Sequence, residues 1–172
     1  MAKIQLKKCY ARKTMRYHIL IITLFLSLNV FASENVVVES YGLYGAVGSK
    51  RVPEQGSPTG YTNEVERFYL VEATKEVSMK IGETFGLKYR VDEGCGIGSV
   101  IDQRITVPNA GMVRPQDNSR VSAIIGSRIA RCGEQYDFMF SFDEEWELVP
   151  GKWIFSIGSP SKTLVSIEFN IK

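Results

Sequence analysis

The chain has 172 residues, of which 23% are charged, and a formal net charge of +2. Six basic residues and no acidic ones precede residue 19, so residues 33–172 hold 15 basic and 19 acidic residues, a net charge of −4. The basic balance of the whole chain therefore gives no support for nucleic-acid binding. The one histidine, His18, lies in the same N-terminal part, so residues 33–172 contain no imidazole.

Residues 1–32 have the features of a secretory signal peptide. The basic segment is followed by an apolar stretch, residues 19–32, that is too short for a typical membrane span. Val30 and Ala32 supply small residues before the expected cleavage after Ala32. An uncleaved anchor is the alternative, and Met15 would begin a more ordinary leader than Met1.

Cleavage would leave residues 33–172 as a single exported domain. We expect this domain in the periplasm first, with secretion beyond it as the second choice. It would meet the membrane only through the signal peptide, before cleavage.

Cys95 and Cys132 are the two cysteines that remain, 37 positions apart. In an oxidising compartment such a pair is expected to form one disulfide, worth roughly 4 kcal/mol in the chain-entropy model. Two free thiols are the alternative.

The first half of this domain alternates between strand patterns and one long polar stretch. Residues 36–44, rich in valine and tyrosine, favour a strand. Residues 46–64 hold Gly48, Pro53, Gly56 and Pro58 and have no apolar period, so we expect a loop that is either disordered or functional. Further strands are predicted where apolar residues run together or alternate with polar ones: these are residues 67–73, 77–81 and 85–91.

The second half begins with a glycine-rich break at residues 94–98. No helix follows it, so we interpret it as a turn around Cys95 and not as a nucleotide-binding loop. A weaker strand at residues 99–107 precedes a second polar loop at 109–119. Residues 120–131 favour a strand, with a helix as the alternative. Tyr136, Phe138, Phe140 and Phe142 form an aromatic stripe, which we predict to be core and not a platform for ligand stacking.

The stretch from residue 142 to residue 157 is the predicted structural hub. Trp153, Phe155 and Ile157 alternate with smaller side chains, as in a strand with one buried face. Before them, Pro150 and Gly151 suit the two central positions of a type II turn. Such turns fit tight hairpins poorly, so we expect a corner between two sheets, with Leu148 and Trp153 packed on either side. Residues 165–171 form a closing strand.

Eight or nine short strands with regular turn signals predict an antiparallel β-sandwich after an N-terminal signal helix. The chain also resembles a bacterial family of small exported proteins known only as a domain of unknown function. The likeness rests on YGLYGA (41–46), FYLVEAT (68–74), GETFGLKYR (82–90) and WELVPGKWIFSI (146–157). The corner is similar to the Leu-x-Pro-Gly-x-x-aromatic corner of fibronectin-type sandwiches. The resemblance implies export and an immunoglobulin-like fold, and it implies no catalytic residue.

The residue types restrict the chemistry. Without histidine there is no Ser-His-Asp triad, no Cys-His pair and no imidazole zinc site, and we expect neither a cofactor nor a metal. The acidic cluster Asp143, Glu144, Glu145 and Glu147 is expected to be solvated surface. Calcium binding and carboxylate-based glycan hydrolysis are its alternatives. Dispersed solubilising charges are favoured over an anion-binding face for the arginines, which are Arg104, Arg114, Arg120, Arg128 and Arg131.

These observations predict a non-enzymatic binding or accessory module of the cell envelope, with an unidentified envelope protein or glycan as its partner. Binding residues concentrate on loops, so the candidate contacts are aromatic and arginine side chains in or beside the two polar loops: Tyr44, Arg51, Tyr61, Arg114 and Arg120. An exposed edge strand at residues 36–44 is an alternative contact. The rival enzyme, a glycan hydrolase, would need a pocket that unites Glu145 or Glu147 with a distant acid, with shifted pKa values.

Overall fold

The computed structural model describes residues 35–55, 57–92, 99–108, 111–159 and 161–172, all of which belong to one unit of the chain, residues 33–172. The predicted signal peptide and the glycine-rich segment with Cys95 lie outside the described residues. Within these ranges the chain is built from strands, with one 3₁₀ turn, η1 (Glu145–Glu147). No helix in them has the length and apolar character needed to cross a membrane.

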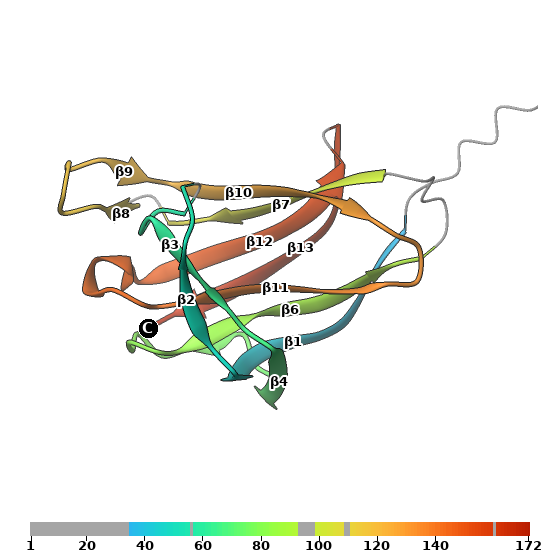
Figure 1. Ribbon diagram of the computed structural model, residues 1–172, viewed down its shortest axis with the longest axis horizontal. Coiled ribbons are helices and arrows are strands. Elements are labelled where there is room, and N and C mark those ends of the chain that lie inside the picture. Colours follow the sequence, from blue (N-terminus) through green and yellow to red (C-terminus); the bar gives the residue numbers. More distant parts are fainter. Residues whose placement is uncertain (1–34, 56, 93–98, 109–110, 160) are drawn as a thin grey trace, which may run out of the picture. The chain divides into compact units, whose positions relative to one another are not determined.

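The strands form two sheets that face each other (Figure 1). The first sheet has the order β11-β6-β1-β4 and the second has the order β10-β7-β12-β13-β5. Neighbouring strands are antiparallel except for β5 and β13. The predicted antiparallel sandwich is confirmed. The first sheet contains β1 (Val36–Val47), β4 (Arg67–Glu72), β6 (Thr84–Val91) and β11 (Gln135–Ser141). The second contains β5 (Glu76–Val77), β7 (Ser99–Thr106), β10 (Ala123–Ala130), β12 (Gly151–Ser159) and β13 (Lys162–Ile171).

The two stretches predicted as loops each contain a two-stranded ribbon. β2 (Lys50–Pro53) pairs with β3 (Tyr61–Glu64), and β8 (Met112–Val113) pairs with β9 (Arg120–Val121). The prediction of structureless loops is therefore wrong in part. Their strands are short and only partly buried, so they lack the apolar alternation by which longer strands are recognised.

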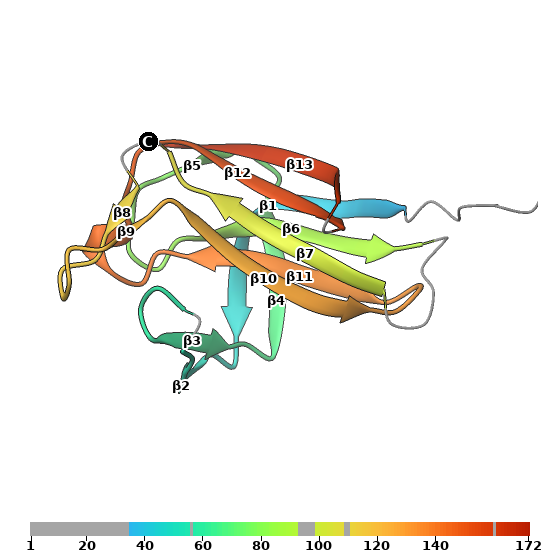
Figure 2. The same ribbon diagram turned by 90° about the horizontal axis from the view of Figure 1, so that it is seen from above.

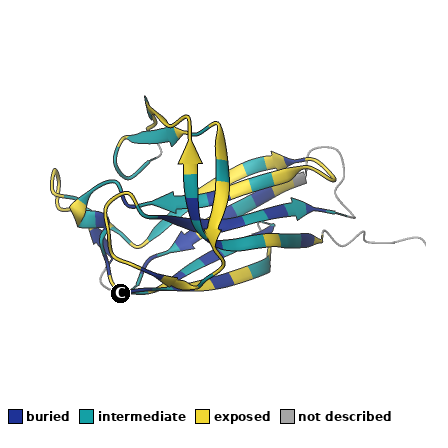
Figure 3. Cartoon of the chain, turned by 90° about the horizontal axis from the view of Figure 1, so that it is seen from below, coloured by how far each residue is buried: buried dark blue, intermediate teal, exposed yellow. Residues whose placement is uncertain are grey.

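Aromatic side chains fill the space between the sheets. Phe85 of β6 lies at the centre, with the rings of five other aromatic residues 5.3–6.0 Å from its own. Phe138 and Phe142 of the predicted stripe are buried here, and Phe140 packs against them, so the prediction of core is confirmed. Buried residues lie on the strands of the two sheets, whereas the segments that project from them are mainly exposed or half-buried (Figure 3).

The predicted corner lies where the chain passes from the first sheet to the second, between β11 and β12. Trp153 is fully buried, and its Nε1 donates a hydrogen bond of 2.8 Å to the carbonyl of Val149. The reversal begins earlier than expected, at η1 and at Leu148, where the Val149 N–H donates to the Glu147 carbonyl at 2.8 Å. Gly151 has the predicted positive φ, at +117°.

β1 bends sharply and divides into two parts. Its register shifts between Val38 and Ser40 and again between Leu43 and Tyr44, so its first part pairs with β6 and its last residues pair with β4. Gly42 lies at the bend with φ +142°, and a Cβ there would come within 2.0 Å of the Glu72 carbonyl oxygen. The last part of β1 and β4 together form what we call the arm, residues 43–47 and 67–72. The arm leads into the β2–β3 ribbon (Figure 2).

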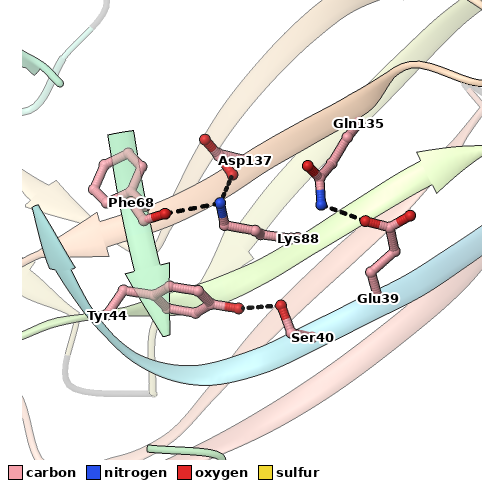
Figure 4. A network of polar contacts seen from close by, with 7 residues as sticks. All are labelled: Glu39, Ser40, Tyr44, Phe68, Lys88, Gln135 and Asp137. Atoms are coloured by element: carbon pink, nitrogen blue, oxygen red, sulfur yellow. Dashed lines mark hydrogen bonds and ion pairs between the residues drawn. The ribbon is translucent and has the colours of Figure 1, made fainter. Parts of the chain in front are cut away.

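Lys88 fastens the arm to the outer face of the first sheet. This side chain lies on β6, on the opposite face from the buried Leu87 and Tyr89. Its Nζ donates to the Phe68 carbonyl on β4 at 2.9 Å and lies 3.2 Å from Asp137 Oδ1 on β11 (Figure 4). Because the Lys88 side chain is 18% exposed, this contact is screened less than an ordinary surface ion pair.

The two predictions for the first strand have different outcomes. β4 pairs with residues 43–47 of β1, so residues 36–42 pair on one side only, with β6. The predicted edge strand at residues 36–44 therefore holds for residues 36–42 among the described residues. Tyr44 is 4% exposed, and its hydroxyl is 2.8 Å from Ser40 Oγ (Figure 4), so it is not a loop contact for a ligand. The bend at Gly42 turns Tyr44 inward, and a pattern of valines and tyrosines does not reveal such a bend.

Candidate functional site

A cleft lies at the side of the sandwich where each sheet ends in an open edge. Its volume is about 380 Å³. Residues 137–141 of β11 form one wall and residues 124–126 of β10 form the other, while Gln103 and Ile105 of β7 lie deeper. Residues 61–63 of the β2–β3 ribbon also line it, so one of the two sequence-predicted loops borders this site. Figure 2 shows the ribbon beside β10 and β11.

The β11 wall is a backbone edge, which is why five consecutive residues line the cleft. β11 is the last strand of its sheet, and the Phe142 N–H donates to the Glu83 carbonyl, continuing the β11–β6 register. In an antiparallel ladder the direction of the backbone groups alternates. The N–H and C=O groups of Met139 and Ser141 therefore point away from β6, toward the side where no described strand pairs with β11.

The ribbon is tied to the acidic connection that follows β11. The Tyr61 hydroxyl donates to Glu144 Oε1 and the Asn63 amide donates to Asp143 Oδ2, both at 2.8 Å. The Arg51 guanidinium carbon lies 3.8 Å from the centre of the Tyr61 ring. Burial and the bond to Glu144 raise the pKa of Tyr61 to about 12, so its hydroxyl stays a donor at any physiological pH. These contacts hold the ribbon over the cleft.

Glu147 contradicts the expectation that the acidic cluster is solvated surface. It is 3% exposed, and its Oε2 accepts the backbone N–H groups of Asp143 at 2.7 Å and Glu144 at 3.0 Å. Burial raises the pKa of Glu147 to about 6 despite these two bonds. Burial also raises the pKa of Asp143, against the opposing effects of Arg51 and Asn63. Glu145 is exposed, as predicted.

The charge of the cleft is predominantly negative. The described residues that line it include four acids and a single base, Arg128. The acids are Glu54, Asp137, Asp143 and Glu147. Glu147 thus lines the same cleft as Asp137 of β11 and Glu54 of the ribbon connection. A shared cleft is one requirement of a carboxylate hydrolase, and Asp137 is already paired with Lys88.

A family model described as "Domain of unknown function (DUF3859)" matches residues 32–171. The chain belongs to this family. Its fold is similar to that of an immunoglobulin-like protein from Pseudomonas aeruginosa, with a TM-score of 0.60 and 20% identity over 83% of this chain and 99% of that chain. The resemblance and the immunoglobulin-like fold predicted from the sequence are confirmed. A search of curated proteins found no match.

In this DUF3859 protein, the predicted contact residues lie in three places. Arg51 and Tyr61 are stacked on the β2–β3 ribbon beside the cleft. Arg114 and Arg120 lie together on the β8–β9 ribbon, where the Arg114 N–H donates to the Ser119 carbonyl and Arg114 Nη1 lies 3.6 Å from Asp117 Oδ2. Those two arginines do not line the cleft. Tyr44 is buried, with its hydroxyl beside Ser40 Oγ.

Sequence reasoning missed the residues of the two open edges, above all Met139, Ser141 and Ile125. Nothing in the order of residues marks a strand as an edge, because strand order is set by pairings between distant segments. Arg128 was predicted as a dispersed surface charge, and the structure places it in the cleft, with its guanidinium carbon 5.0 Å from the centre of the Tyr136 ring.

Two further expectations concern metals and cysteines. In the part of the chain that the structure describes, no group of three or more His, Cys, Asp or Glu residues is placed to hold a metal ion. Cys132 lies in the turn between β10 and β11, where the Gly133 N–H donates to the Val91 carbonyl and Ala130 pairs with Ser99. Val91 and Ser99 flank the segment that contains Cys95, and both therefore lie at the same end of the sandwich as Cys132. The disulfide itself stays a prediction.

Proposed function

We propose that this DUF3859 protein is a non-enzymatic binding module of the cell envelope and that the cleft between β10 and β11 is its ligand site. The observation that carries the proposal is the open backbone edge of β11 inside a cleft of about 380 Å³, beside a ribbon that is tied in place. Loops and edges held on a rigid sandwich are the usual location of binding residues. Export rests on the leader, residues 1–32.

The bonds of the carboxylates favour binding over catalysis. Glu147 accepts two backbone N–H groups and so stabilises the corner, and Asp143 and Glu144 hold the ribbon through Asn63 and Tyr61. A general acid or nucleophile has to direct its oxygen at the substrate. These three side chains direct oxygens at the protein itself, so their first role is structural.

Glycan hydrolysis is the second candidate, and a specific observation favours it. Glu147, with a pKa of about 6, shares the cleft with Asp137 of another element. A carboxyl whose pKa is raised toward neutral keeps its proton in part of the molecules at pH 6 to 7, and this suits a general acid. If this candidate is right, Glu147→Gln abolishes release of reducing sugar from cell-wall glycan fragments and leaves binding of those fragments intact. A rate unchanged by this substitution rules it out.

Photo-crosslinking in cells tests the binding proposal. A photo-reactive amino acid is placed at Ile125, which is 58% exposed and lines the cleft, and separately at Lys162, an exposed residue on β13 of the same sheet. We expect one envelope component to be recovered repeatedly from position 125 and not from position 162. Recovery from both positions alike, or from neither, contradicts a ligand site in the cleft.

Export is tested on the same material. Intact-mass measurement of the protein from the envelope fraction should show a chain that begins at Ser33. Full-length protein in the cytosol would rule out both the leader and the envelope role.

A further inference from the structure

The inference here rests on the proposed function and names the chemical class of the ligand. We propose that the cleft binds an extended, positively charged segment of polypeptide, which adds to the first sheet as a strand beside β11. Strand addition at an open sheet edge gives affinity through backbone hydrogen bonds, and neighbouring pockets select the side chains.

The backbone of β11 supplies the pairing groups. The N–H and C=O groups of Met139 and Ser141 point away from β6, as the ladder alternation requires. The part of β11 that lines the cleft runs from Asp137 to Ser141. Five residues of a strand extend about 17 Å at the usual rise per residue. This length matches a peptide segment of about five residues. Open edges are ordinarily protected against such pairing, and here the ribbon lies beside the edge without pairing with it.

The charge of the cleft selects the kind of peptide. Four acids and one arginine line it among the described residues. Asp137 is paired with Lys88, and Glu147 is buried against two backbone N–H groups. Glu54 and Asp143, which lies two positions after the end of β11, are therefore the acids that a ligand would meet. Lysine or arginine side chains of a strand lying beside β11 would approach Asp143 at one end and Glu54 on the ribbon connection. An acidic segment would meet like charges in the same places.

A glycan fits the same cleft less well. Proteins that bind sugars or bases by stacking present an open aromatic face. Of the four aromatic residues that line the cleft, Phe138 is buried and Phe68 and Phe140 are half-buried. The fourth is Tyr61, which the ribbon brings to the cleft. The Arg51 guanidinium already lies 3.8 Å from the centre of its ring. A sugar would also leave the outward amides of β11 without the regular partners that a strand supplies. These two observations favour a peptide.

A position on β10 outside the cleft provides a matched control. The Val107 N–H donates to the Ser122 carbonyl, so by the same alternation the N–H of Ile129 points away from β7. Ile129 is 68% exposed and does not line the cleft. Met139→Pro removes an outward N–H from β11, and Ile129→Pro removes one from β10. Proline is tolerated on edge strands where the lost N–H had no partner in the sheet.

The test uses random decapeptides displayed on phage and selected against the purified protein, with synthetic copies of the enriched peptides measured by fluorescence anisotropy. We expect enrichment of peptides rich in lysine or arginine. Their affinity should fall at least tenfold with Met139→Pro and with Asp143→Asn, and should change less than threefold with Ile129→Pro. Thermal unfolding of each variant shows whether the fold is retained.

A second measurement does not depend on the variants. N-methylation of the peptide backbone at every second residue should abolish binding in one register of positions and leave the other register unaffected, as strand pairing requires. The peptide proposal is overturned if neutral or acidic peptides are enriched, or if no peptide is enriched. It is also overturned if folded Met139→Pro protein binds the peptides as tightly as the wild type does. In those cases a glycan crosslinked from position 125 would still support the cleft as a binding site, so the two proposals fail separately.

Discussion

The burial of Glu147 is a single-residue feature that the sequence pattern did not predict. Four acids within five positions predict a solvated surface, and Glu145 is exposed as that rule expects. Glu147 is buried because η1 turns the chain within three residues and brings its carboxylate onto the backbone N–H groups of Asp143 and Glu144. Its neighbours in sequence carry no sign of this capping role.

The raised pKa of Glu147 predicts a pH-dependent stability. Its carboxyl has a pKa of about 6 in the folded protein against an ordinary value of 4.5, so the folded state binds the proton more tightly than the unfolded state. The stability that this proton contributes is complete below about pH 4.5 and is lost as the pH rises through 6. Glu147→Gln removes the effect. In urea unfolding, the variant should gain on the order of 2 kcal/mol relative to wild type between pH 4.5 and 7. A constant difference across this range would show that the carboxyl is not buried in solution.

Trp153 gives the largest single-residue prediction. It is fully buried, its ring lies 5.0–5.9 Å from those of Phe85, Phe140 and Phe142, and its Nε1 donates to Val149. Trp153→Ala should lower the free energy of unfolding by about 3–5 kcal/mol, the range for a large aromatic in a core. Chemical unfolding measures it, and a loss under about 1 kcal/mol would mean that the corner is not packed as described.

At the scale of elements, long alternating strands were predicted well and short ones were not. β6 and β11 each have one apolar face, and the period of that face located them within a residue or two. The β2–β3 and β8–β9 ribbons have no such face. They are held by side-chain contacts to distant segments, such as Tyr61 to Glu144, which a local pattern does not contain.

The bend in β1 is the element on which the arm depends. Gly42→Ala would place a Cβ within 2.0 Å of the Glu72 carbonyl oxygen at a φ of +142°, so the strand pairing has to shift. We expect a loss of more than 2 kcal/mol in the free energy of unfolding. Gly126→Ala on β10 is the matched control, because nothing lies within 4 Å of its added Cβ and its φ is not in the positive range. Equal effects of the two substitutions would contradict the bend.

For the whole molecule, the fold class followed from the sequence and the site did not. Alternating strands with regular turns indicate a sandwich whatever the order of its strands. The cleft depends on that order, because β10 and β11 are edges only by virtue of which strands pair with β7 and β6. The arm carries the ribbon to this side of the sandwich. The bond from Lys88 to the Phe68 carbonyl, between residues 20 positions apart, fastens the arm there.

The predicted disulfide belongs to this scale, since it would join the β6–β7 and β10–β11 connections, which each link the two sheets. Reduction should lower the melting temperature and expose two thiols to an alkylating reagent. Mass spectrometry of the unreduced native protein after alkylation should show neither Cys95 nor Cys132 modified. Modification of both would mean that the bridge is absent.

The open edge of β11 is the central claim, and amide hydrogen exchange measured by NMR in the ligand-free protein tests it most directly. The N–H groups of Phe138 and Phe140 point to β6 and should exchange slowly, whereas those of Met139 and Ser141 should exchange at least a hundredfold faster. Uniform slow exchange along residues 138–141 would show that another segment already pairs with β11, and the cleft would then have no free edge to offer a ligand.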